Sequence, residues 1–516
     1  MRTWESLLLL ADLLAFLDLS IRQVYGRRWM RGSPVIALVT LVALMVAAAQ
    51  WLAEGPRWQM LPAYALAMLF LPAWLVQSAA SIGGLKGWKQ PHPTAAAVVI
   101  TLGALGLVIA AALPIMVPVF RFSEPSGPYA IGTLTYHWVD ASRAEAFVAD
   151  PKEQRQLMVQ VWYPAQAHPS GQRAAYMADA DTVTAAFARL HDKPAFLFGH
   201  LKYVTTNARS SVAAATDQVR YPVLLFLEGA TGFRQMNTFQ VEHLVSHGYI
   251  VIAIDQPGAA AAVVFPDGRH AFGLTVPQFH AMVGPSYMPV ATNSTRTGLL
   301  LPNGSTLLDN SIIPYLAQDV SFTLDQLAAL NLADPNGVLA GKLDLLRVGV
   351  FGVSLGGIVT GEACRLDARL RACLVIDAPM SIDVVKAGLK QPSMWITRDA
   401  ASMRIERQRA GGWPDAEIEA HQNSMRATYE GSSGAGYFVQ MPGMFHSDFT
   451  DIASWTPLAR VLGLAGTIDE GRAHNIVNAY SRSFFDRHLA GRPAALLDGA
   501  AKHDPKVLFE SRRLKH

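Results

Sequence analysis

The fold of this 516-residue chain is decided by residues 347–379, RVGVFGVSLGGIVTGEACRLDARLRACLVIDAP. A short apolar run ending at Gly352 is followed by a glycine-rich turn, a segment of helical pattern and a second apolar run that ends at Asp377. Short, nearly continuous apolar runs are typical of strands that are buried on both faces of a parallel sheet. The stretch therefore predicts a strand, a sharp turn, a helix and a second strand.

The turn itself, Gly352-Val353-Ser354-Leu355-Gly356, matches the G-x-S-x-G pattern of a nucleophile elbow. In such an elbow a strained turn between strand and helix lifts the serine hydroxyl above the sheet. Glycines are needed because a larger side chain would collide with the tight turn. The pattern alone is weak, but the strand before it and the helix after it supply the expected setting. We therefore predict that Ser354 is a nucleophile.

The same alternation of apolar runs and helical patterns extends over most of the chain after residue 123. It predicts an α/β fold in which helices cover both faces of a mainly parallel sheet. Two long stretches without obvious strands, residues 165–220 and 257–313, are typical of lids or pocket walls. The predicted strands are residues 157–164, 221–228, 249–255, 347–352, 371–377, 393–397 and 436–441.

A serine hydroxyl needs a base to take its proton and an acid to orient that base. In α/β-hydrolases these residues follow the nucleophile in the order Asp, His, each after a strand. Asp377 ends the next predicted strand, and His446 follows the last one. The rival base, His474, begins the final helical pattern, where a surface histidine is ordinary. We predict an α/β-hydrolase fold with Ser354, Asp377 and His446 as its catalytic triad.

Acyl transfer also needs N–H donors for the negative charge that develops on the carbonyl oxygen. One donor is expected at Leu355, directly after the nucleophile, and the other at Ala230, in the loop after an early central strand. Three nearby acids are expected to have structural roles. Glu228 would hold the loop by hydrogen bonds, and Asp448 and Asp451 would lie in loops or helix caps.

The beginning of the chain has a different character, because three of its apolar runs contain no Lys, Arg, Asp or Glu. About 20 helical residues cover the roughly 30 Å hydrocarbon core of a bilayer, so each run is long enough to span it. An earlier run, residues 6–19, carries Asp12 and Asp18 and is either an interfacial helix or a fourth span. We expect a membrane region at residues 1–122 and a catalytic domain at 123–516, after the linker SEPSGP. The three runs are residues 34–53, 61–82 and 94–120.

Basic residues flank these runs unevenly, which predicts the orientation of the chain. The loop between the first and second runs holds only Arg57 against Glu54. Because basic flanks stay in the cytoplasm, the catalytic domain is expected on the extracytoplasmic side, periplasmic or extracellular. The basic residues before the first run and between the second and third are Arg22, Arg27, Arg28, Arg31, Lys86 and Lys89.

Composition excludes several other classes of function. A net charge of +3 favours no nucleic-acid partner, and 51% hydrophobic with 16% charged residues suits an enzyme with a membrane part. The 15 histidines show no metal-ligand spacing, and no phosphate-binding loop is present, so neither a metal nor a nucleotide cofactor is expected. Cys364 and Cys373 are expected as two reduced buried thiols, with a disulfide in an oxidising compartment as the alternative.

Four segments together resemble the plasma-type platelet-activating factor acetylhydrolases, also called the lipoprotein-associated phospholipase A2 group. The likeness covers about residues 127–491 and leaves the membrane region outside. It implies the α/β-hydrolase fold, the triad named above, and an oxyanion hole formed by the N–H groups of Ala230 and Leu355. The segments are GPYAIGTLTYHWVD with LMVQVWYPA, FLEGATGFRQMNTFQVEHLVSHGYIVIAIDQP, GVSLGGIVTGEACRLDARLRACLVIDAPM and GMFHSDFTD.

Three positions around the expected pocket depart from that family. Val353 stands where the family has a histidine, and Leu227-Glu228-Gly229 replaces its Ser-His-Gly loop. Ala378-Pro379-Met380 replaces a tryptophan that follows the acid. These changes bear on the substrate more than on the reaction.

The expected function is that of a membrane-anchored serine esterase, which hydrolyses short or oxidised sn-2 acyl esters of glycerophospholipids through an acyl-enzyme. Its partners would be the membrane and a phospholipid or small ester substrate. An alternative is a general carboxylesterase or polyester hydrolase of the dienelactone hydrolase or cutinase kind. A third reading, a non-catalytic membrane-anchored binding domain, is disfavoured by the intact Ser, Asp and His. Acyl-length preference and oligomeric state do not follow from the sequence.

Overall fold

The computed structural model describes residues 1–25, 35–81, 92–150, 152–167, 169–275, 277–278, 282–283, 286, 312–498 and 504–512. The chain divides into two compact units. The smaller unit consists of Met1–Phe120, Gly199–Tyr203 and Trp455–Pro457, and the larger one consists of Arg121–Phe198, Val204–Ser454 and Leu458–His516.

The larger unit is built on an eleven-stranded sheet, in which all seven strands predicted from the sequence are present. The strands lie in the order β13 (Leu508–Arg512), β12 (Gly436–Gln440), β11 (Ser393–Thr397), β10 (Leu370–Ile376), β9 (Leu343–Val353), β5 (Tyr221–Leu227), β6 (Ile250–Asp255), β2 (Gln154–Ala165), β1 (Ala130–Ala144), β4 (Thr205–Ser210) and β3 (Arg173–Ala175).

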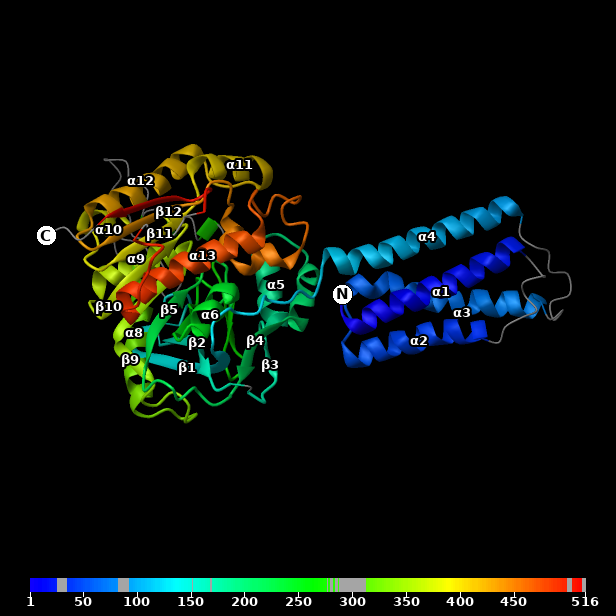
Figure 1. Ribbon diagram of the computed structural model, residues 1–516, viewed down its shortest axis with the longest axis horizontal. Coiled ribbons are helices and arrows are strands. Elements are labelled where there is room, and N and C mark those ends of the chain that lie inside the picture. Colours follow the sequence, from blue (N-terminus) through cyan, green and yellow to red (C-terminus); the bar gives the residue numbers. More distant parts are fainter. Residues whose placement is uncertain are drawn as a thin grey trace. The chain divides into compact units, whose positions relative to one another are not determined.

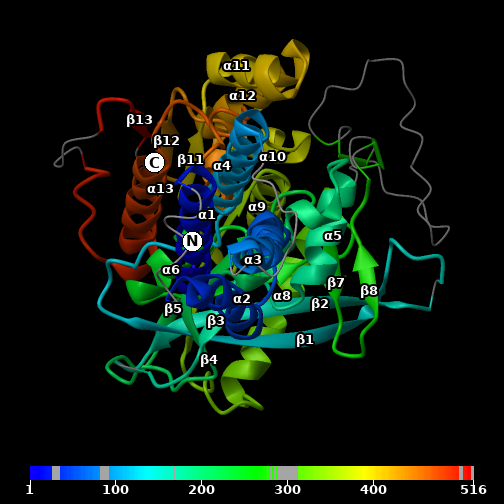
Figure 2. The same cartoon turned by 90° about the vertical axis from the view of Figure 1, so that its right-hand side faces the viewer.

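The centre of this sheet is parallel. Neighbouring strands pair in parallel from β12 through β11, β10, β9 and β5 to β6. Beyond this run, β13 pairs antiparallel with β12, and β2 pairs antiparallel with β6. The long strands β1 and β2 lie side by side in Figure 1 and Figure 2. The expectation of an α/β fold with a mainly parallel sheet is confirmed.

Apolar side chains fill both faces of the sheet, because successive residues of a strand point to opposite sides. Along β5, Leu225 belongs to one hydrophobic cluster while Leu224 and Phe226 belong to the other. The first cluster includes residues of α8 (Ile313–Leu332), α9 (Leu355–Leu366) and α12 (Asp415–Gly431), and the second includes residues of α6 (Thr238–Ser246) and α13 (Glu470–Phe485). The central strands are therefore covered on both faces, as their continuous apolar runs predict.

The stretches that show no obvious strand in the sequence do contain some. Residues 165–220 include β3, β4 and α5 (Ala180–Leu190), and residues 257–313 include the hairpin of β7 (Ala262–Val264) and β8 (His270–Phe272). These strands are short and β4 alternates between buried and exposed positions, so they produce no continuous apolar run. Residues 276, 279–281, 284–285 and 287–311 of the second stretch lie outside the described residues.

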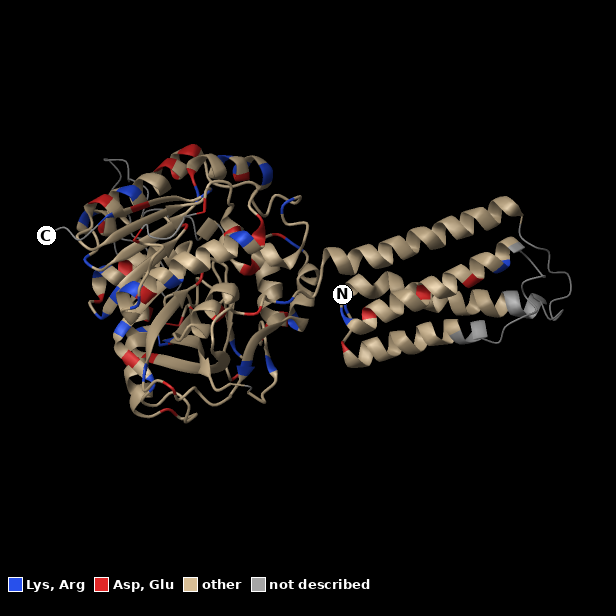
Figure 3. Ribbon diagram, viewed as in Figure 1, with Lys and Arg blue, Asp and Glu red and all other residues tan. Residues whose placement is uncertain are grey.

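The smaller unit contains α1 (Thr3–Tyr25), α2 (Val35–Ala53), α3 (Leu61–Ser81) and α4 (Pro93–Met116). Figure 3 shows no charged residue along the described lengths of α2, α3 and α4. Within the described chain, two stretches are long and apolar enough to cross a membrane, Trp58–Val76 and Pro93–Met116, and Val39–Ala53 is a shorter apolar helix. The basic residues at 27, 28, 31, 86 and 89 lie outside the described residues.

The prediction of two reduced thiols is wrong, because Cys364 on α9 and Cys373 on β10 form a disulfide. Both cysteines are buried, and their Cα atoms are 6.5 Å apart across a sequence separation of nine residues. This spacing lies within the range that a disulfide can bridge. The tight connection from α9 back into the sheet therefore brings the two thiols together.

Candidate active site

Ser354 lies between β9 and α9 with φ 57° and ψ −122°. The glycines on either side leave no room for a side chain. A Cβ added to Gly356 would lie 2.1 Å from the carbonyl oxygen of Leu227, and one added to Gly352 would lie 2.3 Å from that of Gly356. Only glycine fits such contacts, so the residues form the strained elbow that the sequence predicts.

Asp377 directly follows β10 and is fully buried. Its Oδ1 accepts a hydrogen bond from the Thr397 hydroxyl at 3.0 Å, and its Oδ2 lies 2.6 Å from Nδ1 of His446. Burial alone would raise the pKa of Asp377. The positive charge of Arg398 and the hydrogen bond to His446 outweigh burial and hold this pKa well below its ordinary value. The carboxylate therefore stays charged.

His446 begins the short 3-10 helix His446–Phe449 after β12, and its side chain is 31% exposed. With Nδ1 donating to the Asp377 carboxylate, Nε2 is the ring nitrogen left to accept a proton. The structure therefore brings Asp377 and His446 together. Within the described chain, no hydrogen bond joins the Ser354 hydroxyl to the His446 ring, and such bonds often tighten only when substrate binds.

The other candidates from the sequence make local contacts instead. His474 stacks on Phe239 at 3.7 Å, and its Nε2 lies 3.3 Å from the carbonyl oxygen of Thr450. Asp448 accepts the N–H groups of Phe445 and Gly466, which holds the loop around His446. Asp451 accepts the N–H groups of Thr238 and Phe239 at the start of α6. These contacts are made to backbone groups in loops and at the start of a helix.

The loop after β5 lies against the nucleophile. A Cβ added to Gly229 would be 3.2 Å from Cβ of Ser354, and Ala230 follows it, packed against the hydrophobic core. The next residue, Thr231, has φ 59°, and its N–H donates to the carbonyl oxygen of Ala259 at 2.7 Å. Leu355, the other expected donor, is the first residue of α9. Both expected donor positions therefore border the Ser354 turn.

Glu228 supports this loop from beneath. Its side chain is buried, and Oε1 accepts the N–H of Gln256 at 3.1 Å. Burial, with the negative charge of Asp255 nearby, raises the pKa of Glu228 well above its ordinary value. The residue therefore holds the loop through a hydrogen bond, in the role expected from the sequence.

Three residues near His446 were not predicted from the sequence: Arg398, Glu406 and Trp413. Arg398 directly follows β11, its side chain is 3% exposed, and its Nε lies 2.9 Å from Oδ2 of Asp377. The same guanidinium forms an ion pair with Glu406 of α11 (Ala400–Ala410). Arg398 could have been found, since β11 is the parallel neighbour of β10 and the carboxyl ends of such strands meet.

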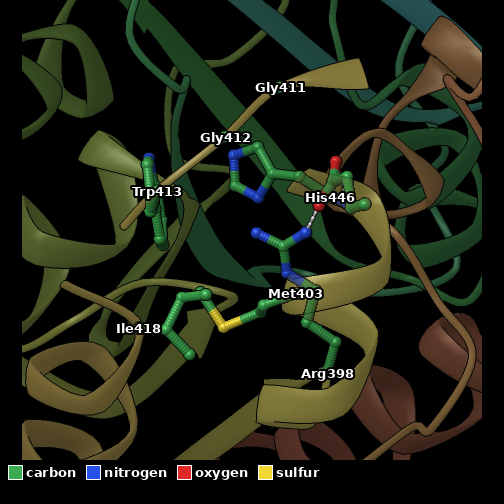
Figure 4. A pocket seen from close by; sticks show the side chains of 8 residues that line it. Arg398, Met403, Gly411, Gly412, Trp413, Ile418 and His446 are labelled. Carbon is green, nitrogen blue, oxygen red and sulfur yellow. Dashed lines mark hydrogen bonds and ion pairs between the residues drawn. The ribbon is translucent and has the colours of Figure 1, made fainter. Parts of the chain in front are cut away.

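A cavity of about 190 Å³ opens beside His446. Figure 4 shows the Arg398 guanidinium next to the His446 ring, with Trp413 to one side and with Met403 and Ile418 in the lower part of the view. The Trp413 ring lies 5.6 Å from the guanidinium carbon and 6.0 Å from the His446 ring. The site thus combines a buried acid, an exposed imidazole and a small cavity with aromatic and aliphatic walls. Among the described residues, no group of three or more His, Cys, Asp or Glu side chains could hold a metal ion.

One family model matches part of the chain. The family model of platelet-activating factor acetylhydrolase, isoform II, matches residues 116–271. This segment contains the opening strands and the Ala230 loop, and it ends before Ser354. The match therefore covers the first half of the sheet and one side of the site.

Curated relatives carry related names. Platelet-activating factor acetylhydrolase of Gallus gallus is 22% identical over 302 residues, which are 56% of this chain and 66% of that protein. The enzyme of Canis lupus familiaris is 24% identical over 58% of this chain and 63% of its own length. A probable 1-alkyl-2-acetylglycerophosphocholine esterase of Arthroderma benhamiae is 24% identical over 76% of this chain and 94% of its own length. The chain spans just under two thirds of the length of the two vertebrate relatives.

Among solved structures, a ferulic acid esterase from Streptomyces cinnamoneus has a TM-score of 0.56 and 27% identity. It covers 76% of this chain and 99% of its own. The resemblance that the sequence predicts is therefore confirmed: the chain is a relative of the platelet-activating factor acetylhydrolases with an α/β-hydrolase-like fold, and the comparisons support a carboxylic ester hydrolase.

Proposed function

We propose that the protein is a serine esterase in which Ser354 is the nucleophile, His446 the base and Asp377 the acid. The single observation that carries this proposal is the 2.6 Å contact between Asp377 and His446 at the strand ends next to the Ser354 elbow. The backbone N–H of Ser354 donates to the carbonyl oxygen of Ile376, the residue before Asp377, so nucleophile and acid lie at adjacent strand ends.

The first half of the reaction forms an acyl-enzyme. The Ser354 hydroxyl attacks the ester carbonyl carbon while Nε2 of His446 takes its proton, and Asp377 stabilises the imidazolium. The N–H groups of Ala230 and Leu355 stabilise the negative oxygen of the tetrahedral intermediate. The intermediate then collapses, the bond to the alcohol breaks, and the alcohol leaves with the proton from His446.

The second half releases the acid. Water attacks the acyl carbon while His446 takes a proton from it, and the second intermediate expels the Ser354 oxygen, which regains that proton. The products are one carboxylic acid and one alcohol per water consumed. Every proton is moved by this chain's own residues.

For the substrate, we favour short or oxidised sn-2 acyl esters of glycerophospholipids. The relatives named above as acetylhydrolases and as a probable 1-alkyl-2-acetylglycerophosphocholine esterase support this class. A cavity of about 190 Å³ lies next to His446 and could take a small part of such a substrate.

A second candidate is a general carboxylesterase for small aromatic esters. It is favoured by the ferulic acid esterase, which matches over 99% of its own length, and by the Trp413 wall of the cavity. An aromatic ring of a substrate would stack against this indole.

We further propose that residues 1–122 anchor the protein in a membrane and that residues 123–516 form an extracytoplasmic catalytic domain. The two apolar helical stretches support the anchor. The Cys364–Cys373 disulfide supports the location, because such bonds persist in oxidising compartments and are rare in the cytosol.

Three functions are separated by one assay. The full-length protein and Ser354→Ala are given p-nitrophenyl acetate, butyrate and octanoate and a platelet-activating factor analogue. Turnover of the analogue that Ser354→Ala loses supports the phospholipid esterase, whereas turnover of the p-nitrophenyl esters alone supports the general carboxylesterase. If no ester is cleaved and no fluorophosphonate labels Ser354, the protein is a non-catalytic domain.

A further inference from the structure

His446 is held at two points by a closed circuit of four residues. Its Nδ1 lies 2.6 Å from Oδ2 of Asp377, and Nε of Arg398 lies 2.9 Å from that same oxygen. The Arg398 guanidinium reaches on to Oε2 of Glu406, and Oε1 of Glu406 accepts the backbone N–H of His446 at 3.2 Å. The contacts thus form a closed series that begins at the His446 ring and ends at the His446 backbone N–H.

We infer that Arg398 and Glu406 are positioning residues for His446, which fix the angle of its ring and balance the charge of the acid that holds it. This inference rests on the proposed function, because it concerns the base of that reaction. Neither residue needs to touch the reacting atoms. Arg398 acts through Asp377, and Glu406 acts through Arg398 and through the His446 backbone.

Burial shields most of the circuit from water. The side chains of Asp377 and Arg398 are 0% and 3% exposed, and that of Glu406 is 18% exposed. A buried ion pair that loses one partner leaves an uncompensated charge, which is strongly unfavourable. The loop at residues 411–413 covers the circuit from the cavity side, with the Trp413 ring over the guanidinium.

The charges in the circuit have opposite effects on the imidazolium. The Glu406 carboxylate favours a protonated His446, and the Arg398 guanidinium disfavours it, because each acts by its sign. Removing Glu406 should therefore let the neutral base persist to lower pH. Removing Arg398 should require a higher pH before the base is neutral. A purely structural role would not produce shifts of opposite sign.

Other titratable groups also face this cluster. His421 of α12 lies 4.9 Å from Trp413 by ring centres, and burial lowers its pKa to about 3, so it stays neutral in the working range. Asp448 follows His446 by two residues, and burial raises its pKa to about 6. The positive charge of Arg398 lowers the pKa of Asp448, so Arg398→Gln also changes the Asp448 titration, and Glu406→Gln is the cleaner of the two variants.

The test measures kcat/KM for p-nitrophenyl acetate on the full-length protein from about pH 4.5 to 9. For Glu406→Gln we expect the midpoint of the acidic limb to fall by about 0.5 pH units or more, and for Arg398→Gln to rise by a similar amount. Both variants should lose about ten-fold in kcat, because the ring is less well held. The double variant should restore the midpoint to within about 0.2 pH units while kcat stays low.

Matched controls carry the same charge changes at exposed positions of α11 and α12. Arg404 of α11 and Glu419 of α12 lie 4.0 Å apart with side chains that are 42% and 66% exposed. Arg404→Gln and Glu419→Gln should leave the limb unchanged, since exposed pairs contribute little. If Arg398→Gln does not fold, as judged by circular dichroism, Glu406→Gln decides alone, because its side chain is partly exposed. For Glu406→Gln, an acidic limb that does not move, or that moves to higher pH, overturns the inference.

A second readout separates this inference from the proposed function. A fluorophosphonate forms a bond from the Ser354 oxygen to phosphorus and expels fluoride, with the hydroxyl proton passing to His446. Intact-mass measurement of this labelling needs no ester substrate. If the wild type is labelled but cleaves no ester, the substrate proposal fails while the pH shifts still test the circuit. If the wild type is not labelled, both the proposed function and the inference about Arg398 and Glu406 are wrong.

Discussion

Two residues of the proposed triad have backbone conformations that L-amino acids rarely adopt. Ser354 has φ 57° and Asp377 has φ 43°. Each such conformation costs roughly 1–3 kcal/mol and persists only where the surroundings impose it. Here the N–H of Ser354 donates to Ile376 and that of Asp377 donates to Ile396, so neighbouring strand ends hold both residues in place.

The first prediction concerns these side chains. Ser354→Ala or His446→Ala should lower kcat by roughly 10⁴-fold with an unchanged circular dichroism spectrum, because triad members act as a unit. Asp377→Asn should be similarly impaired, since the imidazole would lose its orienting charge. Steady-state kinetics on p-nitrophenyl acetate give the measurement. Near wild-type turnover in a pure Ser354→Ala sample would remove the nucleophile assignment.

The second prediction follows from the buried Glu228. Its folded pKa is raised by burial and by Asp255, so its contribution to stability is fully present below the unfolded pKa and is lost as pH rises through the folded one. Glu228→Gln stays neutral throughout. Between about pH 5 and 8, its free energy of unfolding should therefore gain about 1 kcal/mol or more relative to wild type. Urea denaturation at both pH values measures this gain, and a difference that does not change with pH contradicts it.

The proposed nucleophile and acid could be picked out because Ser354 and Asp377 directly follow strands with continuous apolar runs, where a functional side chain is expected. His446 lies in the loop after the last parallel strand, β12. Arg398 also follows such a run, and the pairing of β11 with β10 is the signal that could have placed it near Asp377. Glu406 was beyond prediction, since it lies on α11 among several other charged residues. Its ion pair with Arg398 depends on how α11 packs beside the strand ends, which the sequence does not show.

At the scale of elements, burial on both faces decided what could be predicted. The strands β5, β6 and β11 are buried at every position, and their apolar runs are unbroken in the sequence. The edge strands β3 and β13 alternate with exposed polar residues and leave no such signal. The disulfide was missed for a related reason, because cysteine spacing alone does not show how tightly α9 returns to β10.

The third prediction concerns this disulfide. The double variant Cys364→Ala/Cys373→Ala should lose about 2 kcal/mol of unfolding free energy, because its unfolded chain is no longer closed into a short loop. Thermal melting with and without dithiothreitol makes the comparison. Wild type in reductant should match the untreated variant, and the variant itself should not respond to the reductant. Equal stability of all samples would contradict the bond.

The fourth prediction concerns the turn between α11 and α12, which carries Trp413. Gly411 and Gly412 precede it with φ 82° and 153°. If the indole limits the cavity, Trp413→Ala should raise kcat/KM for p-nitrophenyl octanoate relative to acetate by about three-fold or more. Trp413→Phe keeps an aromatic wall and serves as the control. An unchanged ratio would place the substrate elsewhere.

At the scale of the whole molecule, the surface of α4 differs from that of a soluble enzyme. Large apolar side chains on this helix are more than half exposed, including Val98, Leu102, Leu105 and Val108. Contiguous apolar surfaces of this kind mark protein or membrane interaction sites. They support the proposed anchor, and their high hydropathy is what made this region predictable from the sequence.

The fifth prediction tests the orientation of the chain. Alkaline phosphatase fused after His516 should be active, and a fluorescent protein that matures only in the cytoplasm should be dark at the same site. The two fusions are each other's control, since expression is measured for both. The opposite pattern would place the catalytic domain in the cytoplasm, where the Cys364–Cys373 disulfide would not be maintained.

The disulfide also joins the helix that begins after the proposed nucleophile to the strand that ends before the proposed acid. Cys364 lies near the end of α9 whose other end carries Ser354, and Cys373 lies on β10, which ends beside Asp377. The covalent bond therefore connects two regular elements, helix α9 and strand β10. The direct pairing of β9 with β10 sets the spacing of Ser354 and Asp377, and the disulfide adds a covalent link between α9 and β10. Reduction would break this bond, and the elements that carry the proposed nucleophile and acid would then be joined by noncovalent contacts and by the chain between them.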